Sequence, residues 1–523
     1  MAVGYKTPGV YIEEKNAFPN SVVAVPTAVP VYIGYTQQAT KSGKSIIGKP
    51  TRITSLVEYM QYFGGAPGYS LEMKDVGEEA TANSFPLGDK NYEIGKDDAD
   101  AMNNFLLFDA LRLFYFNGGG PCYIVSVGTF KGGKVEKDAL LGGVKKLEFE
   151  EEPTMVLSPD ALSLEPADYY SVATAILAHC KKMQSRVGIF DVHNGWAWED
   201  GEGKDLINGE GGFREGIGTN FLNYGAAYYP WLNTNVVTEN QLTYQNIKDH
   251  GTVLKDALSA EADILYPVTE GEGLSPEQEK SNAKNEEFKK ELEGLADDTY
   301  TADQVEALNQ KLMTISPTYK GIIMKEMLAR LNLLPPAPAM AGVFTSVDNY
   351  RGVWKAPANV SLNSVISPSV NINADQQEDL NVPLNGKAVN AIRTFPGQGV
   401  IVWGSRTLDG NSQDWRYIPV RRTLIFLEMS IKAAAKAYVF EPNTSATWSL
   451  MNNMITNFLT SVWKAGGLAG SSPGEAFNVQ VGLGTTMTAN DILDGYMRVT
   501  VLVAPVRPAE FIVITFQQKM QES

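Results

Sequence analysis

Apolar residues recur every three or four positions in several long segments of the chain. In one such segment the stripe includes Phe105, Phe108 and Leu111, and an Asn-Gly-Gly-Gly turn follows it. This period is typical of an amphipathic helix with one buried face. The pattern predicts helices over residues 55–63, 101–116, 166–184, 305–334, 421–438 and 446–464.

Shorter runs of β-branched and aromatic residues lie between these segments. They predict strands over residues 29–34, 121–127, 187–191, 351–357, 388–394, 399–403, 498–504 and 509–517. The alternation of helices and strands indicates an α/β architecture with mixed α+β character, spread over several domains. The apolar stretches 337–344 and 499–506 have the length of strands. No apolar run reaches the roughly 18 residues of a membrane-spanning helix, so no membrane insertion is expected.

The first 36 residues predict an extended arm followed by a core strand. Residues 5–12 are β-prone but contain a Pro-Gly pair, and residues 16–20 have turn composition. Pro26 and Pro30 interrupt the valine-rich segment that follows. Proline cannot donate to a β-ladder, so these strands belong at an edge.

Composition shifts divide the chain into three regions. We expect an arm and first strand over 1–36, a middle α/β region forming the outer domain or domains over 37–340, and a C-terminal domain over 341–523. Pro335-Pro336 marks the second boundary. Within the middle region, residues 270–293 hold eight Asp and Glu and four Lys. They predict a solvated acidic insertion over about 268–300.

Charge is distributed unevenly along the chain. The net charge is −16, from 44 basic and 60 acidic residues, which disfavours nucleic acid as a partner. Residues 351–523 carry 14 Lys and Arg against 12 Asp and Glu, whereas the first 350 residues carry 30 against 48. This asymmetry predicts two faces, one in water and one against a partner.

Catalytic and ligand-binding motifs are weak. Cys122 and Cys180 lie in apolar surroundings and predict buried thiols, and the three histidines are widely spaced. The segment around Ser472 matches the G-x-S-x-G motif of a nucleophile elbow, but a helix and a Gly-rich loop precede it instead of a strand. His193, at a strand end, has no matching partners in sequence. We therefore expect no catalytic residue, no metal site and no cofactor.

Ordered blocks at both ends of the chain resemble contractile phage tail sheath proteins. The N-terminal blocks are TPGVYIEE (7–14), VAVPTAV (23–29) and YIGYT (32–36). The C-terminal blocks are YRGVWKAPAN (350–359), NAIRTFPG (390–397), VWGSRTL (402–408), WRYIPVRR (415–422), VFEPN (439–443) and APVRPAEF (504–511). Both sets occur on one chain, unlike the two-protein sheath of type VI secretion systems. The resemblance is therefore to sheaths of phage tails, tailocins and extracellular contractile injection systems.

The resemblance implies a mechanical function without enzymatic activity. Such sheaths polymerise helically around an inner tube in a metastable extended state, and they contract to drive the tube through a target envelope. Terminal arms complete the sheet of a neighbour's C-terminal domain, which has a mixed sheet and flanking helices. The residues expected in these arms are Tyr5, Val10, Tyr11, Ile12, Val23 and Val25 at one end and Phe511, Val513 and Thr515 at the other.

The resemblance also implies contacts with an inner tube through the C-terminal helices. The candidate residues are Arg422, Lys432, Lys436 and Lys464, although lysines of this kind are often merely solvated. The expected partners are other copies of the chain, an inner tube protein, and baseplate and terminal cap proteins. No charged segment followed by an apolar one opens the chain, so we expect no signal peptide, synthesis in the cytoplasm, and a particle that remains there or is released on lysis.

Two other functions stay open on sequence grounds. A cytoplasmic α/β enzyme with no recognisable motif would form a small discrete oligomer. Another self-assembling protein, such as a capsid subunit, would form closed shells. Particle shape distinguishes all three.

Overall fold

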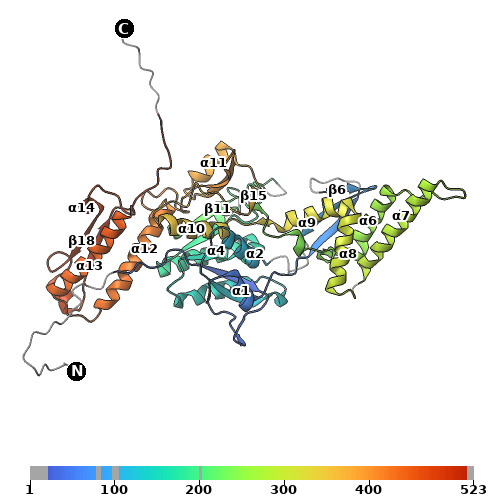
Figure 1. The fold of residues 1–523 in the computed structure, drawn as a ribbon. Helices are drawn as coiled ribbons and strands as arrows, with labels where there is room; N and C mark the ends of the chain where they lie inside the picture. Colours follow the sequence, from blue (N-terminus) through green and yellow to red (C-terminus); the bar gives the residue numbers. More distant parts are fainter. Residues whose placement is uncertain (1–21, 78–83, 97–104, 200–202, 298, 515–523) are drawn as a thin grey trace, which may run out of the picture. The chain divides into compact units, whose positions relative to one another are not determined.

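A computed structural model describes residues 22–77, 84–96, 105–199, 203–297 and 299–514 (Figure 1). The chain forms two compact units. The larger comprises Thr27–Arg422, and the smaller comprises the chain from Thr423 together with the residues before Thr27. The division falls within helix α12 (Ile418–Ala435). The boundary predicted at residue 341 is therefore wrong, because strands beyond it belong to the central sheet of the larger unit.

The larger unit is built on an eight-stranded sheet in the order β17-β16-β11-β10-β9-β1-β8-β4. The inner six strands are parallel, and β4 and β17 close the edges antiparallel. This sheet confirms the predicted α/β architecture. Its strands are β1 (Pro30–Thr36), β4 (Thr51–Ile53), β8 (Cys122–Thr129), β9 (Met155–Leu157), β10 (Val187–Asp191), β11 (Gly225–Tyr229), β16 (Asn390–Phe395) and β17 (Gly399–Trp403).

Helices cover both faces of this sheet. Tyr32 of β1 packs against Phe114 of α2 (Leu107–Phe116), with ring centroids 5.6 Å apart. The next residue, Ile33, faces Gly143 of α3 (Lys137–Lys146). Successive strand residues point to opposite faces, so α2 and α3 lie on opposite sides. Further helices are α1 (Leu56–Phe63), α4 (Pro166–Met183), α5 (Phe213–Gly216) and α10 (Ala337–Arg351).

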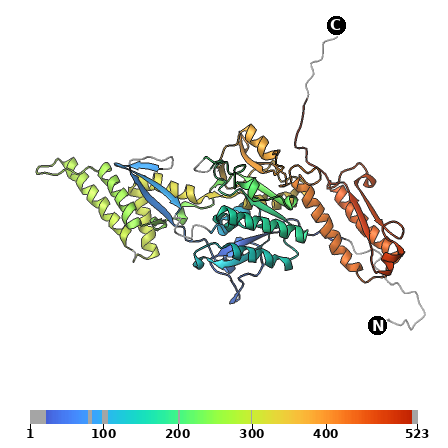
Figure 2. The ribbon, with the colours of Figure 1, turned by 180° about the vertical axis from the view of Figure 1, so that it is seen from behind.

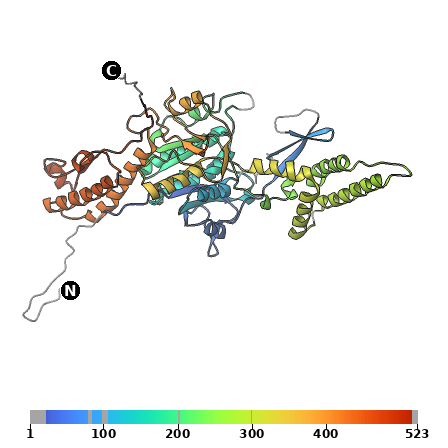
Figure 3. The same ribbon diagram turned by 45° about the horizontal axis from the view of Figure 1, so that its top comes forward.

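Helix α10 corrects the prediction of a strand-sized stretch at 337–344. The helix packs against α2 (Figure 3) and is buried on all sides over its first two turns. A continuous apolar run therefore belongs here to a core helix, which periodicity alone does not separate from a buried strand. Gly342 permits the close packing, since a Cβ there would stand 2.6 Å from the carbonyl oxygen of Phe114.

Two distant segments of the larger unit share a second hydrophobic core. Strands from residues 71–96 lie against helices from residues 255–331 (Figure 2). The sheet order is β13-β5-β7-β6. The elements are β5 (Leu71–Gly77), β6 (Ser84–Leu87), β7 (Lys90–Lys96), β13 (Ile247–Lys248), α6 (Lys255–Leu265), α7 (Pro276–Leu292), α8 (Ala302–Ile315) and α9 (Met324–Leu331). We call this part the acidic subdomain, because residues 236–332 hold 18 Asp and Glu against 10 Lys and Arg.

The predicted acidic insertion is only partly solvated. Helix α7 begins at a capping box formed by Ser275 and Gln278. Phe288 and Leu292 on its inner face are buried in the core of the acidic subdomain.

The helix predicted over 305–334 is broken between α8 and α9, where Pro317 lies just after α8 and a π-helical turn follows.

Smaller elements complete the larger unit. A three-stranded sheet, β14-β12-β15, joins β12 (Leu232–Thr234), β14 (Leu333–Leu334) and β15 (Val365–Pro368), and α11 (Ala374–Asn381) follows it. Strands β2 (Thr40–Lys41) and β3 (Lys44–Ser45) form an exposed hairpin. The strand predicted at 351–357 is wrong, because these residues end α10 and continue as turns.

The smaller unit contains two long helices and one hairpin sheet. α12 and α13 (Ser445–Lys464) run side by side in Figure 1, with Phe426 against Phe458. The remaining elements are α14 (Pro473–Ala476), β18 (Phe477–Val481), α15 (Ala489–Leu493) and β19 (Val499–Val503). The strand predicted at 509–517 does not form over 509–514, and residues 515–517 lie outside the described part of the chain.

Candidate assembly interface

The sheet of the smaller unit is incomplete. β18 and β19 pair antiparallel from Phe477 opposite Val503 to Val481 opposite Val499. Across the residues that the structure describes, neither strand has a second neighbour. An isolated two-stranded sheet is marginally stable, and each open edge presents unpaired backbone donors and acceptors. Both edges are therefore sites where another strand can add.

Helix α13 covers one face of this hairpin. Phe477 is buried there, and the Asn452 amide on α13 donates a 2.9 Å hydrogen bond to the carbonyl oxygen of Val479. Val499 and Val501 are only half-buried, and Leu502 on the other face is 56% exposed. The hairpin is thus fixed to a helix, whose Asn452 already bonds one carbonyl of β18, while no strand adds to either lateral edge among the described residues.

The described arm residues pair with no strand. The backbone N–H of Val25 donates to Ser430 Oγ at 3.2 Å, whereas Val23 is largely exposed. Phe511 and Val513 are also exposed and lie in a segment without secondary structure. The remaining predicted arm residues, Tyr5, Val10, Tyr11, Ile12 and Thr515, lie outside the described residues.

The candidate tube-facing residues divide into two groups. Lys432 on α12, Lys436 just beyond it and Lys464 at the end of α13 are exposed. Arg422 is buried, and its guanidinium forms a two-pronged ion pair with Asp348 at 2.6 and 2.9 Å. It also donates to the carbonyl oxygen of Thr27 and lies over the ring of Phe344. The prediction that Arg422 contacts a tube is therefore wrong, since its donors are committed within the larger unit.

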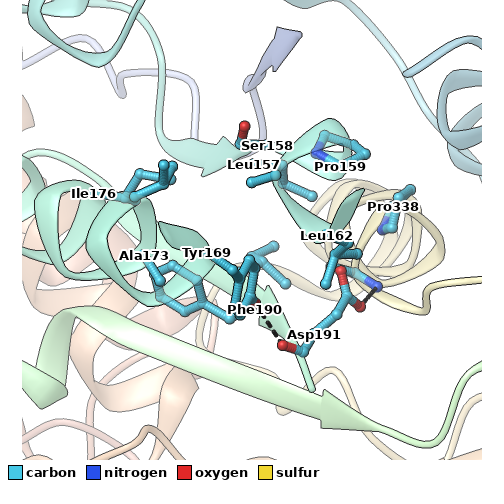
Figure 4. A pocket seen from close by; sticks show the side chains of 14 residues that line it. Leu157, Ser158, Pro159, Leu162, Tyr169, Ala173, Ile176, Phe190, Asp191 and Pro338 are labelled. Atoms are coloured by element: carbon cyan, nitrogen blue, oxygen red, sulfur yellow. Dashed lines mark hydrogen bonds between the residues drawn. The ribbon is translucent and has the colours of Figure 1, made fainter. Parts of the chain in front are cut away.

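The α/β sheet offers little room for a ligand. The pocket in Figure 4, between α4 and the ends of β9 and β10, has a volume of about 20 Å³. That is room for about one water molecule. Asp191 lines it and accepts a 2.7 Å hydrogen bond from the backbone N–H of Ala337 at the start of α10. Burial raises the pKa of the Asp191 carboxyl to about 8.

A second carboxylate fills the crevice where ligands bind in many sheets of this kind. The strand order reverses between β1 and β9, and such switch points bind ligands outside the carboxyl ends of the strands. Asp160, just after β9, accepts backbone hydrogen bonds there from Tyr35, Leu106 and Leu107 at 2.6, 2.7 and 2.9 Å. A phosphate would occupy this position at the N-terminus of α2. The protein's own carboxylate takes its place.

The thiols and imidazoles are structural. Cys122 and Cys180 are fully buried free thiols, as predicted, and burial raises the pKa of each to about 12. Burial and the nearby Arg186 guanidinium lower the pKa of His179 to about 4. The ring Nε2 of His193 lies 2.8 Å from the carbonyl oxygen of Leu164. None of these groups forms a nucleophile–base pair.

Two family models match consecutive parts of the chain. The phage tail sheath protein central domain matches residues 283–408, and the phage tail sheath C-terminal domain matches residues 411–519. These two segments of the chain are similar to phage tail sheath proteins. The C-terminal match contains the whole open hairpin, so the incomplete sheet lies in the segment that resembles a sheath C-terminal domain.

Solved sheath structures resemble this chain along nearly its whole length. The helical sheath of the anti-feeding prophage in its contracted state is 28% identical, with a TM-score of 0.59 over 99% of this chain and 100% of that chain. The contracted sheath of the PVC extracellular contractile injection system is 26% identical, with a TM-score of 0.59 over 99% and 98%.

Curated phage relatives match a smaller part. The tail sheath protein of Vibrio phage KVP40 is 25% identical over 185 residues, which are 35% of this chain and 26% of the phage protein. The matches to such relatives span about a quarter of their length. Among the residues described for this chain, no helix is both long and apolar enough to cross a membrane.

Proposed function

We propose that the chain is the sheath subunit of an extracellular contractile injection particle. It polymerises around an inner tube in an extended, metastable state and contracts to drive the tube through a target envelope. The observation that carries this proposal is the hairpin with two open edges in the domain matched to phage tail sheaths. The whole-length likeness to two contracted sheaths supports the same function.

In this mechanism the open edges receive terminal arms of neighbouring copies. An added strand supplies main-chain hydrogen bonds, so the link survives a change in the angle between subunits. The arms act as hinges and keep the lattice continuous during contraction. No nucleotide is consumed, and the work comes from new burial between subunits. Burial stabilises by about 25 cal/mol per Å², so a few hundred Å² per subunit would contribute several kcal/mol before entropic costs.

The exposed lysines suit a contact with another protein, whereas the acidic subdomain suits a surface in water. Lys432, Lys436 and Lys464 form the candidate contact with an inner tube. The acidic subdomain, with its excess of eight carboxylates, suits a hydrated outer wall. Baseplate and terminal cap proteins are the further partners of this proposal. It includes no enzymatic activity, cofactor, nucleic acid or direct membrane insertion, and it places synthesis in the cytoplasm.

Electron microscopy of the chain expressed alone tests the proposal. We expect hollow, ridged tubes of uniform width. Closed shells would instead favour a capsid-like protein. Compact particles, even after co-expression with an inner tube protein, would favour the enzyme.

Truncation tests the arm mechanism separately. Removing residues 1–20 should abolish polymerisation and leave a folded subunit, because only the arm is lost. Circular dichroism and sedimentation would check folding and size. Replacing residues 270–274, in a loop of the acidic subdomain, with a Gly-Ser loop of equal length is the matched control and should leave tube formation intact. Normal tubes from the truncated chain would contradict arm exchange.

A further inference from the structure

The turn between α12 and α13 holds a bulky aromatic residue in a strained conformation. Phe440 has φ of 72°, and its side chain is fully exposed. The left-handed region is costly for a large residue and persists only where the surroundings enforce it. Val439 beside it is also exposed. Within the subunit, the exposed ring of Phe440 buries no surface that would offset the strained backbone.

Hydrogen bonds fix this turn. Thr447 Oγ1 donates to the carbonyl oxygen of Pro442 at 2.7 Å, and the indole N–H of Trp448 donates to Asn443 Oδ1 at 2.7 Å. The backbone N–H of Thr444 also donates to Pro442. An aromatic side chain on a pre-ordered turn binds without a further entropic cost of ordering the backbone. Such aromatic side chains are frequent hot spots of protein interfaces.

The same turn is tied to the open hairpin. The Asn443 amide donates to the carbonyl oxygen of Tyr496 at 3.0 Å, in the loop that leads into β19. Tyr496 of this loop and Leu493 at the end of α15 are 56% and 83% exposed. We call Val439, Phe440, Leu493 and Tyr496 the turn cluster, because the Asn443–Tyr496 bond joins their two segments. Tyr496 lies three residues before Val499, at the end of the hairpin where Val481 pairs with Val499.

The chain itself carries a segment with matching chemistry. Residues Phe511–Ile514 are four consecutive apolar residues, 70–88% exposed, in the same compact unit. A run of this kind without a charge is unfavourable in water and adds readily to an open strand edge. The turn cluster and residues 511–514 are both largely apolar, and neither is buried within the subunit. The two surfaces can therefore bury each other when they come from different copies.

We propose that the turn cluster, through the ring of Phe440, is the anchor that receives residues 511–514 of a neighbouring copy. The inference rests on the proposed function, because it requires polymerisation through the open hairpin. Main-chain pairing along an edge gives affinity but fixes register poorly. An aromatic anchor at one end of the hairpin fixes the register, so that the segment cannot slide.

Glycine at position 440 gives the first test. Phe440→Gly removes the ring and relieves the strain, because glycine adopts positive φ freely. We expect a subunit with an unchanged or higher Tm and at least a tenfold loss of tubes by electron microscopy. Phe149→Ala is the matched control, since Phe149 is also highly exposed but lies in the larger unit. It should form tubes as the unmodified chain does.

Disulfide trapping gives a second test that keeps Phe440 in place. V439C is combined with I512C or with V513C, which sample both faces of an extended segment. Oxidised tubes should give a ladder of covalent multimers from at least one pair, and no ladder from any single variant or from F149C with V513C. Cys122 and Cys180 will not compete because both are fully buried.

The outcomes separate this inference from the proposed function. Normal tubes from F440G, or no ladder from either cysteine pair in well-formed tubes, would overturn the anchor. Tubes of F440G that form alone but fail to retain an inner tube protein would also overturn it and assign the turn cluster to that protein. Failure of the unmodified chain to form tubes would remove the proposed function, and the anchor with it.

Discussion

At the residue scale, the buried carboxyl of Asp191 makes the stability of the larger unit depend on pH. Asp191 keeps its proton in the folded state well above the pH at which an unfolded aspartate loses it. Between about pH 4 and pH 8 the folded state therefore binds more protons than the unfolded state. By linkage, this group makes folding less favourable as pH rises across that window.

Asp191→Asn tests this directly. Asparagine keeps an oxygen for the backbone N–H of Ala337 and cannot ionise. We expect the Tm of the unmodified chain to fall between pH 6 and pH 9 and the Tm of the variant to fall less. Each kcal/mol of unfolding free energy lost lowers the Tm by roughly 2 °C. Differential scanning calorimetry at both pH values would measure it. Asp256→Asn, at an exposed aspartate, should leave the dependence unchanged, and identical curves for D191N and the unmodified chain would contradict the account.

Arg422 gives a prediction about stability. Arg422→Ala leaves Asp348 as an uncompensated buried charge and should cost about 3–5 kcal/mol. The double variant R422M/D348L should recover much of that loss, because both charges are removed together. Urea unfolding of the isolated subunit would measure both. Arg52→Ala, at an exposed ion pair with Glu152, should change stability by less than about 1 kcal/mol.

The sequence predicts Arg422 as a tube-facing surface residue and gives no sign of its burial. The partner, Asp348, lies on another helix 74 residues away, and no local pattern connects the two. The cysteines were predicted correctly because their apolar neighbours on both sides are a local signal. The anchor candidate Phe440 was quoted only as part of a family block, since a backbone angle is invisible in sequence.

At the element scale, the predicted helices and strands agree best with the structure where the local hydrophobic periodicity is strong. The strands at 187–191 and 399–403 have the predicted bounds, and α13 differs from its prediction by one residue at its start. The predictions fail where tertiary contacts determine the secondary structure. α10 is helical because it is buried between other elements, and β18 was missed because a five-residue strand needs its partner β19 to form.

Helix α7 provides the prediction at this scale. A merely solvated insertion would tolerate Phe288→Ala, whereas the packed helix should lose about 3–5 kcal/mol because Phe288 is buried. Hydrogen exchange would localise the effect to the acidic subdomain. Glu287→Ala, at the adjacent exposed position, is the matched control. Equal stability of both variants would show that α7 does not belong to this core.

At the scale of the whole molecule, the sequence indicated the family but not the division of the chain. The shift in composition after Pro335-Pro336 predicts a C-terminal domain from residue 341, yet residues 390–403 supply two strands of the central sheet. Chain continuity does not reveal that a sheet collects strands from residue 30 to residue 403. The smaller unit contains the open hairpin through which we propose that copies of the chain polymerise.

A cryo-electron microscopy reconstruction of the assembled tubes would show directly whether strands are exchanged between copies. We expect each β18–β19 hairpin to carry an added strand from a neighbouring copy on both edges, with the terminal arms traceable between subunits. A polymer in which the hairpin keeps two strands and the arms remain within their own subunit would contradict this expectation.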